Sequence, residues 1–498
     1  MFEPLLPGYD MTVFHQWATR IAGGALSDGR AFYQAPLYPY VLGALYALAG
    51  PSALAAKLFQ AVLGSLTVLL TYSLGSRLFS RRAGIIAALL TALTPIFPFY
   101  EIFLLRATLV TFLNLAFLLA LFKFDRQKPM RGAIIAGVLL GIGTLARSNL
   151  LALWPVAAAW VWLVGGKGKS GLKALAVMTL AAGLAISPAT LHNRIEGETW
   201  ALVSTNFSEN WKIGNSLDSE GGFGYPEKEL APVFSLTFLK LQANKAKFLL
   251  RDYEQPNNTN FYQMQPDNPW LGLGNFLSWN LYLAFGLAGI ILTRGRWRQL
   301  FPLYGYLLFY GGTLVLFFVT SRFRVPLWPA LILFSAAGID RTSSMWKAGK
   351  RLEPALAKVL ATILAAAMLL SNPRTIQPQY WDNLALIHER RGQWEEASGV
   401  MRSKERLHPD DPETLWKLAY YLQQEGGLER ASQVLERLLK ISGGHPEVLK
   451  EAGLLDLKLG RTERGVARLQ GYLKATPGAA DSSTIVELIA EQNTDKNQ

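Results

Sequence analysis

Positive charge in this chain follows its apolar segments in a regular alternation. Long apolar stretches run from about residue 52 to 372, and every second short loop between them is basic while the others carry little charge. The basic loops contain Arg77, Arg81 and Arg82; Lys123, Arg126, Lys128 and Arg131; Lys167, Lys169 and Lys173; Arg294, Arg296 and Arg298; and Arg341, Lys347, Lys350 and Arg351. Because short cytoplasmic loops of membrane proteins are rich in lysine and arginine, the alternation predicts a polytopic membrane protein and fixes its orientation.

A membrane-spanning helix needs about 20 apolar residues, and ten segments come near that length. They cover about 53–76, 83–100, 104–123, 131–146, 149–165, 171–191, 274–293, 299–319, 325–340 and 354–372. Since ten is an even number, the charge rule places both ends of the chain on the outer side, the periplasm of a Gram-negative bacterium. We therefore predict a multi-pass protein of the bacterial inner membrane, with a membrane domain over residues 51–372.

The first 50 residues are predicted to form an external loop with surface helices. They contain no cleavable signal peptide and no clear span, and PLYPYVLGALYALAG (36–50) is too short to cross a bilayer but suits a helix on the membrane surface. An outer N-terminus without a preceding span is uncommon. We therefore expect the natural chain to begin upstream of Met1 with one more helix; the alternative is a complete chain that inserts its N-terminus unaided.

The composition excludes several classes of function. The net charge of +13 would suit a nucleic-acid-binding protein, but the basic loops alone hold 17 lysines and arginines, so topology accounts for the charge and no nucleic-acid partner is expected. The absence of cysteine excludes disulfides and thiolate sites. The five histidines are scattered, and neither a zinc-type spacing nor a nucleotide-binding loop is found. No cofactor is predicted, and a divalent metal held by carboxylates stays an open alternative.

A long external segment, about 193–272, separates the sixth and seventh predicted spans. Loops of this length usually carry function or structure of their own. Its amide and aromatic side chains are typical of sugar binding and equally of a capping subdomain, and both interpretations stay open. They are Trp200, Asn206, Asn210, Trp211, Asn215, Tyr225 and Tyr253.

A 34-residue repeat follows the last predicted span, in a predicted domain over residues 373–498. Small and apolar residues recur in register at Trp381/Leu415/Leu449, Ala385/Ala419/Gly453, Gly392/Gly426/Gly460, Ala397/Ala431/Gly465 and Met401/Leu435/Leu469. This period predicts about three tetratricopeptide repeats between residues 378 and 478. Such repeats form a concave surface for a protein partner, here on the outer side.

Charged residues near the outer edge of the spans are the candidates for a functional site. Charges close to the hydrocarbon are costly and normally face a cavity or one another. Singly, each has a structural alternative, such as a helix cap, an ion pair or a contact with lipid headgroups; together, their confinement to one side favours a shared outward-facing cavity. The charged residues are Asp10, Glu101, Arg106, Arg147, Arg322 and Arg324, and the amide Asn149 lies beside Arg147.

An ordered series of motifs over residues 8–340 resembles the GT-C glycosyltransferases of the protein-O-mannosyltransferase-like and aminoarabinose-transferase-like branch. The series is YD, QWATRIAGG, FYQAPLYPYVLGALYALAG, SRLFSRRAGIIAALLTALTPIFPFYE, LARSN, NWKIGNSLDSEGGFGYP and SRFRVPLWPALILFSAAG. The resemblance implies an all-α fold: a polytopic membrane helix bundle of GT-C type, followed here by the repeat solenoid. It departs from the family at the front, because only nine residues precede Asp10 where members have a membrane helix.

The resemblance also implies an activity and roles for single residues. Such enzymes move a sugar from a polyprenyl-phosphate carrier to an acceptor hydroxyl or phosphate outside the cytoplasm. Asp10 matches the family's base and Glu101 its second acidic residue, while Asn149, Tyr33 and Asn215 are candidates for binding the sugar or acceptor. Arg106, Arg147, Arg322 and Arg324 are the candidates for holding the lipid-linked phosphate, which guanidinium groups bind well.

This assignment gives a simple mechanism, and other functions remain open. A carboxylate removes the acceptor proton, arginines stabilise the departing phosphate, and attack opposite the leaving group inverts the anomeric carbon. The expected partners are the lipid-linked donor, membrane lipid, a protein or glycan acceptor and a protein bound by the repeats. The alternatives are an O-antigen-type polymerase or ligase, a membrane scaffold that recruits partners through its repeats, and a transporter.

Overall fold

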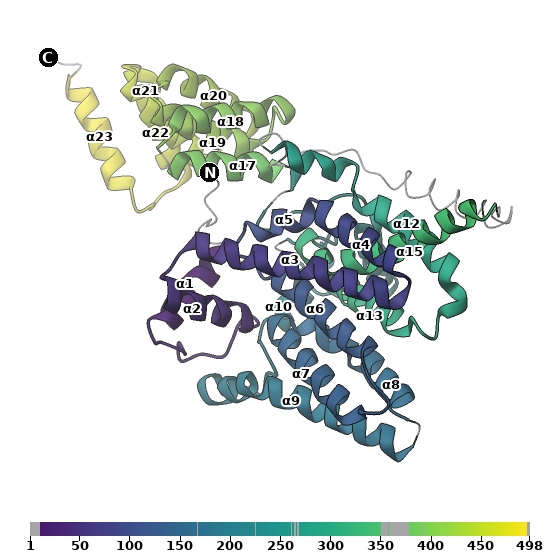
Figure 1. The fold of residues 1–498 in the computed structure, drawn as a ribbon. Coiled ribbons are helices and arrows are strands. Elements are labelled where there is room, and N and C mark those ends of the chain that lie inside the picture. The colour runs from purple at the N-terminus through teal and green to yellow at the C-terminus, as the bar shows by residue number, and fades with distance from the viewer. Residues whose placement is uncertain are drawn as a thin grey trace. The chain divides into compact units, whose positions relative to one another are not determined.

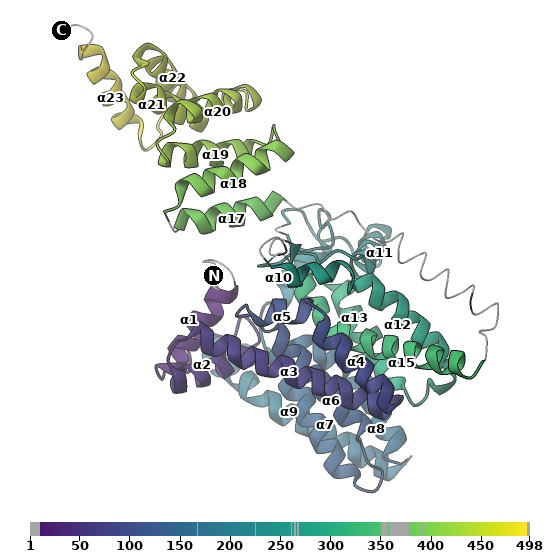
Figure 2. The same cartoon turned by 45° about the horizontal axis from the view of Figure 1, so that its top comes forward.

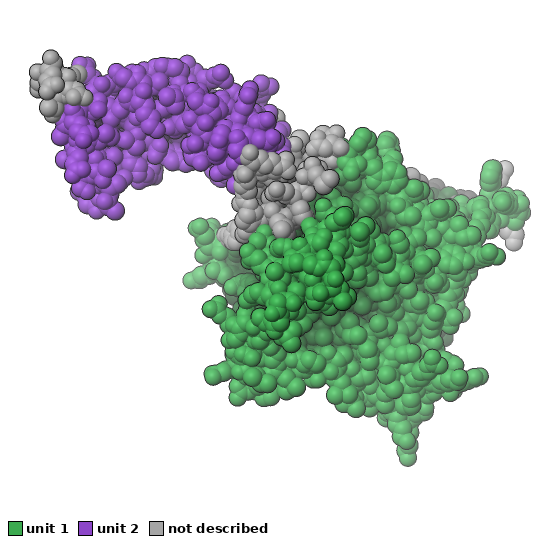
Figure 3. Space-filling model, turned by 60° about the vertical axis from the view of Figure 1, so that its left-hand side comes forward, with its two compact units in different colours: residues 1–374 green, residues 375–498 purple. Residues whose placement is uncertain are grey.

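The computed structural model describes residues 10–166, 168–224, 226–259, 261–262, 265, 268–349, 357, 378–390 and 392–495. The chain divides into two compact units, residues 1–374 and residues 375–498 (Figure 3). Within the described ranges the regular secondary structure is helical, apart from one antiparallel bridge between Ser216 and Leu230. The predicted all-α class is confirmed for this part of the chain.

The first unit is a bundle of helices (Figure 1, Figure 2). Most of its buried apolar side chains form one large cluster, and Ala35, Ile186 and Val203 form a smaller one. Its α-helices are α1 (Asp10–Ala22), α2 (Leu37–Ala49), α3 (Ala53–Leu78), α4 (Arg81–Leu93), α5 (Ile96–Glu101), α6 (Ala107–Phe122), α7 (Pro129–Ala146), α8 (Trp154–Val164), α9 (Lys169–Gly197), α10 (Phe207–Asn215), α11 (Leu236–Leu250), α12 (Trp279–Thr293), α13 (Phe301–Leu316), α14 (Ser321–Arg324) and α15 (Trp328–Lys347). Its 3-10 helices are η1 (Ser148–Leu153), η3 (Pro269–Asn275), η4 (Arg294–Arg296) and η5 (Val325–Leu327).

Four described helical segments are long and apolar enough to cross a membrane: Ala53–Leu78, Pro129–Ala146, Lys169–Gly197 and Ser321–Lys347. A bent pair, Pro269–Asn275 with Trp279–Arg296, makes a fifth when it is counted as one span. Shorter apolar helices occupy three further predicted spans, at Ala107–Phe122, Ser148–Val164 and Phe301–Leu316. The total of ten spans stays a prediction, and the last of them, 354–372, lies outside the described residues except for Ala357.

The segment predicted as one span at 83–100 is divided in two. Helix α4 ends at Leu93 and α5 begins at Ile96, because Thr94 has extended backbone (ψ 114°) ahead of Pro95. Proline disfavours helical backbone for the residue before it and has no N–H group to continue the helix. The break lets α5 end at Glu101.

Three of the basic loops lie together at one end of the bundle. The Nε atom of Arg77 donates to the carbonyl oxygen of Phe122 (2.8 Å), and the hydroxyl of Ser80 donates to Asp340 (2.7 Å). Arg82 also pairs with Asp340, at 3.6 Å. The loops after α3 and α6 and the end of α15 are therefore neighbours, as expected for loops on one side of a membrane.

Glycines allow the closest helix contacts in the bundle, as is common between membrane helices. A Cβ atom on Gly137 of α7 would lie 2.2 Å from the carbonyl oxygen of Met178 on α9, and one on Gly289 of α12 would lie 1.9 Å from that of Phe334 on α15. The contact with α9 matters for the site, because α7 ends at Ala146 and the next residue is Arg147.

The second unit contains three successive helix pairs. They are α17 (Pro378–Arg390) with α18 (Trp394–Leu407), α19 (Pro412–Gln424) with α20 (Leu428–Ile441), and α21 (Pro446–Lys458) with α22 (Thr462–Ala475), followed by α23 (Ser482–Asp495). The first helix of each pair begins with proline, at intervals of 34 residues. The small residues Ala385, Ala397, Ala419 and Ala431 of the sequence repeat are buried in its core. The helix pairs follow the sequence period, and their assignment to the tetratricopeptide family stays a prediction.

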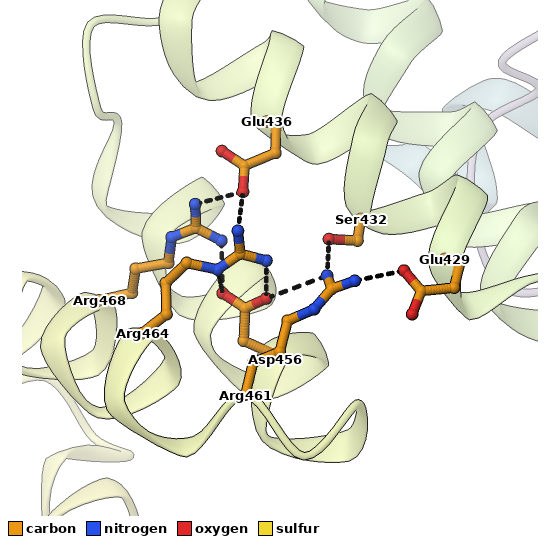
Figure 4. Close-up of polar contacts among 7 residues, drawn as sticks. All are labelled: Glu429, Ser432, Glu436, Asp456, Arg461, Arg464 and Arg468. Carbon is orange, nitrogen blue, oxygen red and sulfur yellow. Dashed lines mark hydrogen bonds and ion pairs between the residues drawn. The ribbon is translucent and has the colours of Figure 1, made fainter.

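A buried carboxylate links the last two helix pairs (Figure 4). Asp456 of α21 is fully buried and accepts hydrogen bonds from Arg464 (2.9 Å) and Arg468 (2.6 Å) of α22. Arg468 also binds Glu436 of α20, at 2.5 Å. Arg461 adds a contact to Asp456 at 3.7 Å and donates to Ser432 of α20 at 3.0 Å.

We expect Asp456→Asn to loosen this part of the second unit. Removing one partner from a buried charged network costs about 3 kcal/mol, since Arg464 and Arg468 lose their shared anion. Hydrogen exchange of α21 and α22 in the full chain should become about 100-fold faster. Asp410→Asn, at an exposed aspartate of the same unit, is the control; equal protection in the two variants would contradict the prediction.

Candidate active site

One cavity of about 840 Å³ in the first unit gathers most of the predicted site residues. Asp10, Tyr33, Arg106, Arg147, Asn149 and Arg322 all line it, from segments that are far apart in the sequence. The lining also includes Gln34, Asn206, Glu209, Asn210, Lys212 and Phe323. Seven residues were predicted to share one outward-facing cavity, and Glu101 and Arg324 are not among its lining. The structure brings together the other five: Asp10, Arg106, Arg147, Asn149 and Arg322.

Asp10 begins α1 and is the centre of the polar contacts in this cavity. Its carboxylate accepts hydrogen bonds from Gln34 Nε2 (2.9 Å) and Asn258 Nδ2 (2.9 Å), and it forms an ion pair with Arg322. Burial alone would raise the pKa of the Asp10 carboxyl, but the charges of Arg322 and Arg106 and the hydrogen bonds from Arg322 and Gln34 outweigh burial. The pKa of Asp10 therefore lies well below its usual range.

Three guanidinium groups share the cavity with this carboxylate. Arg106 is the residue before α6 and donates to Gln34 Oε1 (3.0 Å), so Gln34 links it to Asp10. Arg147 has extended backbone between α7 and η1, and its guanidinium carbon lies 3.5 Å from the centre of the Phe323 ring. Arg322 lies 4.8 Å from the centre of the same ring, and its buried Nε has no hydrogen-bond partner among the described residues.

The two arginines of the SRFR motif face different surroundings. Arg324, two residues after Arg322, is 1% exposed and does not line the cavity. Its guanidinium binds Glu254 (2.5 Å) and the carbonyl oxygens of Arg251 (2.6 Å) and Tyr253 (3.0 Å). It therefore joins α14 to the segment after α11, and the structure does not bring it to the other three arginines.

Glu101 also lies apart from Asp10, in a separate cavity of about 200 Å³. The cavity is lined by Gly64 and by hydroxyl side chains such as Thr91 and Thr108. The carboxyl group packs against α3 so closely that a Cβ atom on Gly64 would lie 1.9 Å from Glu101 Oε1. Burial raises the pKa of Glu101 to about 7.

The candidates for sugar and acceptor binding are placed differently from one another. Asn149 donates to the Thr313 hydroxyl (2.7 Å), and Tyr33 donates to Glu209; all four residues line the large cavity. Asn215, in contrast, is the last residue of α10, is fully buried and is not part of the lining.

The other aromatic and amide residues of the external segment divide in the same way. Asn206 and Asn210 line the cavity, while Trp200 lines a second, apolar space next to it. Trp211 packs on Phe317, Tyr253 stacks on Tyr262, and Tyr225 lies outside the described residues.

An apolar groove of about 750 Å³ adjoins the charged cavity. Three residues, Leu151, Ala152 and Leu202, line both spaces. The groove continues over α8 and α9, past Trp154, Ile186, Leu191 and Trp200. An amphiphile with an anionic head and a hydrocarbon tail would match this arrangement, in which an apolar groove adjoins a charged cavity.

Several residues of the site were not predicted from sequence. Gln34 and Asn258 bind Asp10, Phe323 lies beside two arginines, and Glu209 binds Tyr33. Gln34 and Phe323 lie within the FYQAPLYPY and SRFR motifs, and this position could have marked them as site residues. Asn258 and Glu209 lie in no such motif. Within the described ranges, no group of three or more histidine, aspartate and glutamate side chains is placed to hold a metal ion.

Comparisons with known proteins extend the resemblance seen in the motifs. Residues 33–192 match the family model described as dolichyl-phosphate-mannose-protein mannosyltransferase, which covers less than half of the chain. None of the curated proteins matches.

The solved structures that match this chain are distant from it in sequence. ArnT of Cupriavidus metallidurans bound to undecaprenyl phosphate is 15% identical, with a TM-score of 0.45, over 95% of this chain and 77% of that one. The oligosaccharyltransferase AglB of Archaeoglobus fulgidus, in complex with an inhibitory peptide and a dolichol-phosphate, is 15% identical, with a TM-score of 0.40, over 77% of this chain and 54% of that one. This chain thus corresponds to about half the length of AglB.

We expect the two SRFR arginines to differ in their effect on stability. Arg324→Met leaves Glu254, whose side chain is 7% exposed, buried without its cation, at a cost of about 3 kcal/mol. Arg322→Gln costs less, because Asp10 keeps its bonds from Gln34 and Asn258. Thermal unfolding of the purified protein tests this order, and equal loss in both variants would contradict it.

The raised pKa of Glu101 predicts a pH-dependent stability. A carboxyl group whose pKa rises from 4.5 to about 7 on folding binds more protons when folded, so the stability it contributes falls as the pH rises through that window. Glu101→Gln should therefore unfold at a higher temperature than the wild type at pH 8 and lose most of this advantage at pH 5. The exposed Glu220→Gln is the control; a gain independent of pH would contradict the assignment.

Proposed function

We propose that the chain is a membrane glycosyltransferase that takes a sugar from a polyprenyl-phosphate carrier and transfers it, with inversion, to an acceptor outside the cytoplasm. The observation that carries this proposal is the joining of the cavity of Asp10 and three arginines to an apolar groove. The family model matched by residues 33–192 supports it.

The charges of the cavity call for an anionic ligand. Arg106 is repelled electrostatically by both Arg147 and Arg322. With Lys212, four basic side chains line the cavity against the two carboxylates of Asp10 and Glu209, which leaves a surplus of positive charge. A phosphate diester, with charge spread over its free oxygens, would bridge these guanidinium groups. The unpartnered Nε of Arg322 gives it one more donor.

The apolar groove supplies the matching place for a polyprenyl chain. Its lining is almost wholly hydrocarbon, and it meets the charged cavity at Leu151, Ala152 and Leu202. A lipid lying along it would bring its phosphate to Arg147, four residues before Leu151. The donor is activated before it arrives, so no nucleotide site is needed.

Asp10 is the proposed base, and its low pKa sets a condition on the mechanism. Paired with Arg322, its carboxylate is a weak proton acceptor. A bound phosphate competes for Arg322 and adds negative charge nearby, and both effects raise the pKa of Asp10. Binding of the donor therefore prepares the base for the acceptor.

The transfer then proceeds in one displacement. The acceptor oxygen forms a bond to the anomeric carbon as the bond from that carbon to the phosphate oxygen breaks, while the acceptor proton passes to Asp10. The polyprenyl phosphate leaves as an anion that Arg106, Arg147 and Arg322 stabilise. Asn149, Tyr33, Asn206 and Asn210 offer hydroxyl and amide groups to the sugar or acceptor.

We further propose Glu101, Arg324 and Asn215 as residues that support the site from outside its lining, in place of the contacting roles suggested by sequence. From the orientation that the basic loops predict, we infer that the site and the helix pairs of the second unit lie on the periplasmic side of an inner membrane. A protein partner or acceptor held by the helix pairs would then reach the site from that side.

Sugar transfer in membranes tests the proposal, using a panel of radiolabelled polyprenyl-phosphate sugars. Asp10→Asn should lower transfer about 100-fold or more while the protein still folds. Asp28→Asn, at an exposed aspartate that pairs with Arg20 and does not line the cavity, should transfer at the wild-type rate.

Unchanged transfer by Asp10→Asn would remove Asp10 as the base. A folded wild type that transfers no sugar from any donor would contradict the enzyme and favour the scaffold alternative.

A further inference from the structure

Lys245 of α11 is a fully buried lysine with no carboxylate partner within ion-pair distance in the described part of the chain. Its Nζ atom lies instead within hydrogen-bond distance of four neutral oxygens, among which its N–H groups are shared: the carbonyls of Gly214 (2.9 Å), Leu316 (3.2 Å) and Phe317 (3.0 Å), and the side-chain oxygen of Asn215 (2.9 Å). Burial lowers the pKa of Lys245 to about 7.

The four oxygens belong to the ends of two helices. Helix α10 ends at Asn215 and α13 ends at Leu316. The last carbonyl groups of a helix lack partners within it and carry partial negative charge, so a cation placed there caps the helix. Lys245 caps both helices at once.

The two helix ends are in direct contact at this cap. A Cβ atom on Gly214 would lie 1.6 Å from the carbonyl oxygen of Phe317, so any larger residue would separate them. The amide of Asn215 donates to the carbonyl oxygens of Trp211 and Leu316, both at 3.0 Å, and its oxygen accepts from Gln242 of α11 (2.8 Å). Helices α10, α11 and α13 are thus joined by one buried cluster of hydrogen bonds.

The same two helices form a wall of the charged cavity. Helix α10 contributes Glu209, Asn210, Lys212 and Ile213 to the lining, and α13 contributes Thr313 and Leu314. The chain reaches Arg322 of α14 six residues after α13 ends. A shift of α10 against α13 would change this wall and leave the contacts of Arg106 and Arg147 in place.

We propose that Lys245 is a positioning residue, which fixes α10 against the end of α13 and thereby sets the wall on which the sugar or acceptor lies. It touches no reacting group. That this wall receives an acceptor rests on the proposed function; that Lys245 holds α10 does not.

A distance measurement in the full chain tests the role of Lys245. The natural sequence has no cysteine, so Ser208→Cys on α10 and Ile195→Cys on α9, both exposed, accept spin labels without background. Lys245→Met should broaden or shift the distance distribution between the labels. Lys247→Met, at an exposed lysine of the same helix, should reproduce the wild type.

Binding of undecaprenyl phosphate separates positioning from a general loss of structure. Lys245→Met should bind it within twofold of the wild type, because the proposed phosphate ligands are not on α10, whereas Arg322→Gln should bind at least tenfold more weakly. If Lys245→Met loses its affinity for the lipid and also its wild-type distance distribution, the inference is overturned, because Lys245 then has a purely structural role. A wild type that does not bind the lipid counts against the proposed function alone, and the distance result still decides the role of Lys245.

A second variant reaches the same contact without touching Lys245. Gly214→Ala forces the two helix ends apart and should displace α10 in the same measurement, which keeps the inference testable if Lys245→Met does not fold. An unchanged distribution in a folded Lys245→Met protein, or in Gly214→Ala, would overturn the inference.

Discussion

The arrangement of the cavity depends on an excess of positive charge inside an apolar helical bundle. Asp10 shares its cavity with Arg106, Arg147 and Arg322, and pairs directly with the last of them. Charges placed so close to hydrocarbon are costly unless they face partners or a cavity. The surplus positive charge is the feature that a lipid phosphate would satisfy, and the apolar groove beside it gives such a lipid a place for its tail.

The charged residues are held where helices break. Arg106 precedes α6, Arg147 separates α7 from η1, and Arg322 belongs to a helix of only four residues. At these points the chain can turn a side chain into the cavity. The neighbouring helices are fixed by close packing, as where Gly137 of α7 lies against α9. Lys245 binds the carbonyl oxygens at the ends of α10 and α13, two helices that also line the cavity.

Much of this arrangement could be predicted from sequence, because it depends on residue type and spacing along the chain. Four arginines stand out by their position at the outer edge of the predicted spans, opposite the basic loops: Arg106, Arg147, Arg322 and Arg324. The 34-residue period likewise predicts the helix pairs of the second unit. The sequence could not separate Arg322 from Arg324, since the direction of each side chain depends on Glu254 and Asp10, which lie elsewhere in the chain. The burial of Asn215 and Lys245 could not be predicted either, because a buried polar side chain leaves no local pattern in the sequence.

The ionisation of Asp10 is the most informative property to measure. Infrared difference spectroscopy detects its carboxylate, with Asp10→Asn as the reference, and gives the pKa of the group. In the free protein the carboxyl should stay ionised well below the pH at which aspartate normally titrates. Addition of undecaprenyl phosphate should raise its pKa measurably, because the phosphate takes over Arg322. A pKa of Asp10 that does not change when the lipid binds would contradict the account.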